Sequence, residues 1–189
     1  MRKISCLKIG VVLAILTHAC ASNEKFIIEK SKLETPSWAQ LESDRLVKKG
    51  KEVIFVYRGD EELSVSDGIK KSELEAVRRF REKTVSLLER QLGNLTVGLE
   101  ESDRSSVKAL LSKSIDRNFI SNDLISDMYY EKVLPEGSSD SKGVYQIYIL
   151  CHIDHNRIVE AVRSFKFSLV KARSTQLRAL AAKIQESVL

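Results

Sequence analysis

The sequence predicts an α+β domain in which a small, mainly antiparallel sheet is packed by amphipathic helices, in the order β-α-α-β-β-α with a long C-terminal helix. Three observations lead to this fold class. Hydrophobic residues make up 43% and charged residues 30% of the 189 residues, which is typical of a globular chain. Only two prolines and eight glycines interrupt it. Segments with a period of two residues alternate with longer segments whose apolar residues recur every three to four.

The first half of the domain is predicted as one strand and two helices. Residues 52–58, EVIFVYR, are β-branched and aromatic and indicate a strand. A helix is predicted over residues 69–92, and Gly93 with Asn94 is expected to end it. Ser102 is expected to cap the second helix. The expected inward residues are Leu74, Val77, Phe80, Thr84, Leu87, Leu88 and Leu92 in the first helix, and Val107, Leu110, Leu111, Ile115 and Phe119 in the second.

The second half is predicted as two strands and a final helix. Residues 126–134 and 143–153 indicate strands, and residues 135–142 a hairpin loop. From His155 onward the apolar residues recur at helical spacing, and a bend is allowed for at Ser174-Thr175. One strand face carries Tyr145, Ile147, Ile149, Cys151 and Ile153, and the helix stripe carries Ile158, Val162, Phe165, Leu169, Ala172, Leu177, Leu180, Ile184 and Val188.

The N-terminus has the three-part layout of a secretory signal peptide. A basic segment at residues 1–8 precedes the apolar run IGVVLAIL at residues 9–16, and small or polar residues follow. Eight apolar residues are too few to span a bilayer, which takes about 20. Two cleavage sites remain open, one between Ala19 and Cys20 and one after Ala21.

The first cleavage is favoured because Cys20 lies where the apolar run ends. Ala19-Cys20 resembles a bacterial lipoprotein signal, in which a small residue precedes a cysteine that receives lipid. The resemblance implies several acyl chains on Cys20, and each buried CH₂ contributes about 0.8 kcal/mol to membrane binding. Cleavage after Ala21 would instead release the domain into the periplasm.

The domain scheme follows from these boundaries. It comprises a signal peptide at residues 1–19, a lipidated tether at 20–35, an α+β domain at 36–155 and a basic C-terminal helix at 156–189. Cys6 leaves with the signal, so Cys151 remains as the thiol of the domain and no internal disulfide is expected. A Cys20–Cys151 disulfide would require that Cys20 is neither lipidated nor removed.

The charge distribution argues against a nucleic-acid partner. The formal net charge is +5, but removal of the first 19 residues leaves 28 basic against 26 acidic groups. Phosphate-backbone binding needs a concentrated basic surface. From Asn156 onward there are seven basic and two acidic residues. This basic helix is expected to lie against an acidic body, or to face anionic lipid or an acidic partner.

No catalytic motif or cofactor site is predicted. The sequence contains no G-x-S-x-G, no phosphate-binding G-x-x-x-x-G-K-[ST] and no H-E-x-x-H. His152, Asp154 and His155 have the chemistry of metal ligands, but His155 points away from the other two unless the strand ends before it. The segment is therefore interpreted as a polar strand end that begins the last helix, and Cys151 as a core thiol.

Several features together resemble the bacterial twenty-kilodalton lipoprotein family over about residues 35–153. They are Pro36 and Trp38, the helix at residues 74–92 and the strand at 145–153. The resemblance implies a small lipoprotein of the outer membrane or cell surface, some relatives of which belong to flagellar or envelope assemblies. It supplies no catalytic residues. Trp38, beside a turn, is expected to anchor the tether to the domain surface.

The expected function is therefore a membrane-anchored bacterial envelope lipoprotein that acts as a structural or protein-interaction module. Its expected partners are the bilayer, through acylated Cys20, other envelope proteins and a second copy of itself. The alternatives are a soluble periplasmic binding protein and, less favoured, a small enzyme that uses the segment from His152 to His155.

Overall fold

A computed structural model describes residues 26–119, 123–134 and 142–184 and confirms the α+β class. Five strands form one antiparallel sheet in the order β1-β4-β5-β3-β2. The strands are β1 (Phe26–Lys30), β2 (Leu46–Lys49), β3 (Glu52–Arg58), β4 (Ile125–Leu134) and β5 (Val144–Asp154). The helices are the 3₁₀ helix η1 (Ser37–Gln40) and α1 (Val65–Thr96), α2 (Glu101–Asn118), α3 (His155–Val170) and α4 (Thr175–Lys183).

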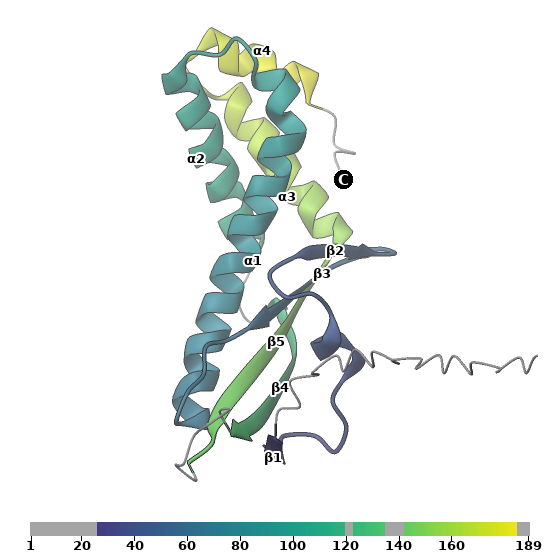
Figure 1. Ribbon diagram of the computed structural model, residues 1–189. Coiled ribbons are helices and arrows are strands. Elements are labelled where there is room, and N and C mark those ends of the chain that lie inside the picture. Colours follow the sequence, from purple (N-terminus) through teal and green to yellow (C-terminus); the bar gives the residue numbers. More distant parts are fainter. Residues whose placement is uncertain (1–25, 120–122, 135–141, 185–189) are drawn as a thin grey trace, which may run out of the picture.

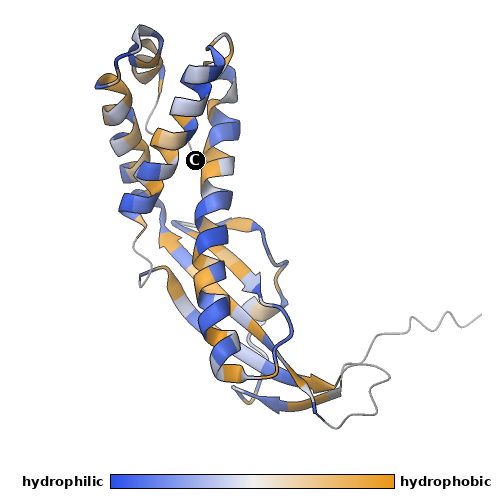
Figure 2. Cartoon of the chain, turned by 90° about the vertical axis from the view of Figure 1, so that its left-hand side faces the viewer, coloured by the Kyte–Doolittle hydropathy of each residue, from blue (hydrophilic) through white to orange (hydrophobic). Residues whose placement is uncertain are grey.

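The long helix α1 connects a sheet half and a helical half of the molecule (Figure 1). Its first half covers one face of the sheet, and its second half packs against α2 and α4 beyond the sheet, while α3 packs against α2 and α4. With 32 residues, α1 is about 48 Å long. Hydrophilic and hydrophobic residues are interleaved along it where it crosses the sheet (Figure 2). This amphipathic character is what lets one helix serve both halves.

One hydrophobic core runs through both halves. The rings of Phe55 and Phe80 stack with centroids 5.7 Å apart, and those of Phe80 and Phe119 lie 5.8 Å apart. Phe165 of α3 belongs to the same cluster and is fully buried. The predicted boundary between residues 155 and 156 therefore falls inside a continuous core.

Two short edge strands were not predicted. β2 and β3 form a hairpin with a two-residue turn, in which Lys49 pairs with Glu52 and Gly50 has a φ of 65°. Glycine adopts this left-handed conformation without the steric cost of a side chain. β1 pairs with β4 inside the interval 20–35 that was predicted as a tether. Residues 26–35 thus belong to the folded domain, while residues 20–25 and the part of the predicted hairpin loop at 135–141 lie outside the described ranges.

The boundaries of the first two helices differ from the prediction. α1 begins at Val65, because Ser64 caps it by accepting a hydrogen bond from the Asp67 amide. It continues through Gly93 to Thr96, and Gly98, with a φ of 88°, takes the left-handed position instead. α2 begins at Glu101, so the expected cap Ser102 lies in its first turn.

Leu74 was predicted to face inward but is 75% exposed. The buried face of α1 follows residues four positions apart, such as Ala76, Phe80 and Thr84. Leu74 lies outside this series and therefore next to the buried face, at the surface. The buried positions are Gly68, Ser72, Ala76, Val77, Phe80, Thr84, Val85, Leu88 and Leu92.

The predicted long C-terminal helix is two helices. The chain leaves helical conformation after α3, and Ser174 caps α4 by accepting a hydrogen bond from the Leu177 amide at 3.3 Å. Arg178 Nη1 donates to the carbonyls of Ala172 and Arg173 and so supports the turn. The predicted inward stripe is confirmed up to Ile184, with Ala172 only partly buried, and Val188 lies outside the described residues.

Candidate functional site

The segment that follows β1 crosses the sheet face opposite α1 (Figure 1). We call residues 31–41, which include η1, the strap. Its first residue is held to β4, since the Ser31 amide donates to the Tyr130 carbonyl and the Tyr130 amide donates to Ser31 Oγ, both at 2.9 Å. The strap thus leads from β1, the strand next to the predicted lipid-bearing end of the chain, toward β2 on the other edge of the sheet.

Asp127 of β4 fastens the strap at two further points. Lys32 Nζ donates to its Oδ1 at 2.6 Å, and Trp38 Nε1 donates to its Oδ2 at 2.9 Å. Burial raises the pKa of Asp127, but the hydrogen bonds from Lys32, the Met128 amide and Trp38 outweigh that effect and hold the pKa below its usual value. The prediction that Trp38 anchors this segment to the domain surface is confirmed.

A buried polar network lies beneath the strap. Glu131, 7% exposed, accepts hydrogen bonds from the hydroxyls of Tyr129 and Tyr148, each at 3.2 Å. Thr35 of the strap lies 3.1 Å from the Tyr129 hydroxyl and so extends the network. Buried carboxylates are tolerated only where such donors satisfy them.

The chemistry of this network favours a structural role. Burial, followed by the Glu131 charge, raises the pKa of Tyr148 to about 12, and burial also raises that of Tyr129. At neutral pH both phenols therefore remain donors to the carboxylate and do not act as bases. On the other side of Tyr148, Arg58 Nη2 donates to Gln146 Oε1 at 2.9 Å. The network fixes the position of the strap on the sheet.

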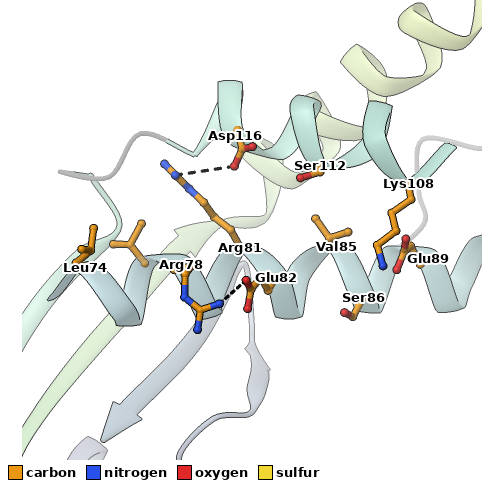
Figure 3. Close-up of a pocket in the computed structure, with 11 residues that line it drawn as sticks. Leu74, Arg78, Arg81, Glu82, Val85, Ser86, Glu89, Lys108, Ser112 and Asp116 are labelled. Carbon is orange, nitrogen blue, oxygen red and sulfur yellow. Dashed lines mark hydrogen bonds and ion pairs between the residues drawn. The ribbon is translucent and has the colours of Figure 1, made fainter. Parts of the chain in front are cut away.

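A groove of about 790 Å³ lies between α1 and α2 (Figure 3). Val77 and Val85 form its apolar floor, and the exposed Leu74 stands on its rim. Charged side chains from both helices line its walls, and they are Arg78, Arg81, Glu82, Glu89, Lys108 and Asp116.

The groove charges balance one another. Arg78 Nη1 lies 2.5 Å from Glu82 Oε1, and Arg81 Nη1 lies 3.9 Å from Asp116 Oδ1 across the groove. Arg81 also donates to the carbonyl of Phe119 at the end of α2. Hydrogen bonds from Arg78 and then Arg79 lower the pKa of the neighbouring Glu75 to about 2. The surface therefore combines apolar contact area with paired charges, as many protein interfaces do.

His152, Asp154 and His155 form the polar strand end that was predicted. β5 ends at Asp154, whose Oδ1 accepts a hydrogen bond from the Asn156 amide at 2.7 Å and so caps α3. The His155 amide donates to the Lys51 carbonyl. Within the described ranges, no group of three histidine, cysteine or acidic side chains is arranged to hold a metal ion.

Cys151 is a core thiol, as predicted. It is fully buried on the α1 side of β5, and burial raises its pKa to about 12. A thiol in this environment is a poor nucleophile, because the thiolate is the reactive form.

The predicted cleavage and lipidation residues, Ala19, Cys20 and Ala21, lie outside the described residues. The residues that sequence reasoning missed are Asp127 and Glu131. Both are polar positions on the sheet face away from α1, and the alternation of β4 carries the signal that could have found them. None of the helices in the described part of the chain is long and apolar enough to cross a membrane.

Comparison of the chain with family models, curated proteins and solved structures finds no match.

Proposed function

We propose that this protein is a bacterial envelope lipoprotein that is anchored by lipid on Cys20 and acts as a protein-interaction module. The observation that carries the proposal is the position of Cys20, directly after Ala19 and four positions after Leu16, the last residue of the apolar run. The fold adds support, since the N-terminal strand β1 is held in the sheet and the strap is fastened by Asp127.

The proposal places the sheet half close to the bilayer. Phe26, the first residue of β1, is only six positions after Cys20. Six extended residues reach about 20 Å. The predicted 20–35 tether therefore shortens to residues 20–25, and β1 with the strap transmits any force between the anchor and the domain.

The anchor is tested by replacing Cys20 in cells. Wild-type protein is expected to incorporate labelled palmitate and to fractionate with membranes, and globomycin is expected to block its maturation. The Cys20→Ala variant is expected to lose the label and to shift to the soluble fraction. If the wild-type protein incorporates no palmitate and is found in the soluble fraction, the periplasmic alternative with cleavage after Ala21 is favoured instead.

The interaction role rests on the groove between α1 and α2. A photo-crosslinker at position 74, on the groove rim, is expected to capture a protein neighbour or a second copy of the chain. Position 63 is the matched control, because Leu63 is also exposed, at 76%, but does not line the groove. Equal or absent crosslinking at the two positions would contradict the assignment of this surface.

A further inference from the structure

The C-terminal helices carry a strong excess of positive charge. Within the described residues, α3 and α4 with their flanking residues 155–184 contain seven basic residues and one acidic residue, Glu160. The remaining described residues contain 20 basic and 21 acidic groups. The net charge is therefore concentrated on the last two helices, which lie at the end of the molecule away from β1 (Figure 1).

Few of these charges are neutralised by the body of the protein. Arg157 pairs with Asp123 at 3.1 Å, while Lys166 and Arg178 donate to backbone carbonyls. Lys171 and Arg173 form no ion pair with any described residue. The prediction that the basic helix lies against an acidic body therefore does not hold for these two side chains.

Two exposed apolar residues lie beside the unpaired cations. Phe167 is 60% and Val170 is 53% exposed, and Lys171 Nζ lies 4.1 Å from the centroid of the Phe167 ring. Positions three and four residues apart share one face of a helix, so Phe167, Val170 and Lys171 project together. We call these three residues and Arg173 the distal patch.

The distal patch borders a shallow groove between α2 and the turn from α3 to α4. This groove has a volume of about 550 Å³, and Lys171 and Arg173 line it. Asp103 lines it too, but its Oδ2 accepts a hydrogen bond from Ser174 Oγ at 2.7 Å. A phosphate group at this groove would meet two cations that have no other ionic partner.

We propose that the distal patch binds an anionic lipid bilayer. Lysine and arginine side chains attract anionic headgroups, and an exposed phenylalanine beside them inserts into the boundary between headgroups and acyl chains. The same charges disfavour a second copy of the chain, since pairing two patches would bring like charges together. This contact is made by the protein surface and does not require lipid on Cys20.

The two contacts together define an orientation, and this step rests on the proposed function. The distal patch and β1 lie at opposite ends of the molecule, which α1 spans over about 48 Å. A chain anchored through Cys20 that also binds the same bilayer through the distal patch lies along the membrane surface.

Vesicle co-sedimentation tests the proposal with the unlipidated chain of residues 22–189, which keeps every described residue. Wild-type chain is expected to bind phosphatidylglycerol vesicles, to bind phosphatidylcholine vesicles much more weakly, and to be released by high salt. Lys171→Gln is expected to weaken binding about fivefold, and Phe167→Ser with Lys171→Gln to abolish it.

The matched control is Leu63→Ser with Lys70→Gln, which removes one exposed apolar residue and one exposed cation in the sheet half. It is expected to bind like wild type. Thermal melting should show that both double variants remain folded, since all four side chains are exposed.

The proposal is overturned if wild-type chain fails to bind anionic vesicles, as it would if the distal patch served an acidic protein. It is also overturned if the variant with Phe167→Ser and Lys171→Gln binds anionic vesicles as tightly as the control with Leu63→Ser and Lys70→Gln. Neither outcome bears on palmitate labelling of Cys20, so the two proposals fail separately.

Discussion

At the scale of single residues, Asp127 determines how the N-terminal segment is held. It joins Lys32, Trp38 and the Met128 amide, which are contributed by the strap and by β4. The sequence identified Trp38 as an anchor because a lone tryptophan beside Pro36 is typical of a fixed turn. It did not identify Asp127 as the acceptor of the Trp38 hydrogen bond. In the sequence, an aspartate in a strand cannot be told from a solvent-exposed polar residue, because its partner lies far away along the chain.

Replacing Asp127 with alanine is expected to release the strap before the domain unfolds. The variant should lose about 1–2 kcal/mol of stability, since the Trp38 and Lys32 donors lose a partner at a half-exposed position. Trp38 is the only tryptophan, so its fluorescence reports on the strap and circular dichroism reports on the helices. In urea the fluorescence transition should precede the dichroism transition.

Asp123→Ala is the control for that experiment. It removes the exposed ion pair with Arg157, which is expected to contribute less than about 1 kcal/mol. Coincident transitions in both variants would mean that Asp127 does not hold the strap.

Alkaline pH tests the buried network and the core thiol. The folded protein keeps Tyr148 and Cys151 protonated up to a pKa of about 12, whereas their ordinary values are 10.0 and 9.0. Because the unfolded chain releases these protons first, stability is full below about pH 9 and falls as pH rises toward 12. Urea midpoints measured from pH 8 to pH 11 should show this decline, with a shallower slope in Tyr148→Phe. A midpoint that stays constant over this range would contradict the assigned environments.

At the scale of elements, the spacing of apolar residues predicted the longer strands and helices but missed the two short edge strands β1 and β2. β5 alternates over 11 residues and was found within one residue of its true ends. β2 has four residues, two of them lysines, and sits at a sheet edge where packing demands little apolar surface. β1 is also short, with five residues, and lies at the other edge of the sheet, although its sequence FIIEK is mostly apolar. The C-terminal end of α1 was predicted too early, at Gly93, although a single glycine inside a helix costs only about 1 kcal/mol.

Two glycines of α1 give a matched pair of substitutions. A Cβ at Gly68 would lie 2.5 Å from Cδ1 of Ile147, which is fully buried and cannot move freely. Gly68→Ala should therefore cost about 1–3 kcal/mol through overpacking against β5.

Gly93→Ala meets no atom within 4 Å and should stabilise α1 by about 0.5–1 kcal/mol. Thermal or urea unfolding of the two variants measures both effects. Stabilisation by both substitutions would show that Gly68 of α1 does not pack closely against Ile147 of β5.

At the scale of the whole molecule, the fold class followed from composition and periodicity, but the arrangement did not. Nothing in the pattern of α1 alone shows that its first half lies on a sheet and its second half in a helical bundle, because both environments bury one stripe of residues. The two candidate surfaces could not be predicted from the sequence for a similar reason. The groove beside Leu74 and the distal patch beside Phe167 depend on which faces neighbouring helices leave uncovered, and that is decided by tertiary packing.

The central claim is that a domain fastened through β1 and the strap is tied to a membrane by lipid on residue 20. Intact-mass analysis of the mature protein, purified from membranes, tests this claim most directly. The account predicts a chain that begins at Cys20 and carries the added mass of several acyl chains. An unmodified chain that begins at Ser22, or one that retains Met1, would contradict it.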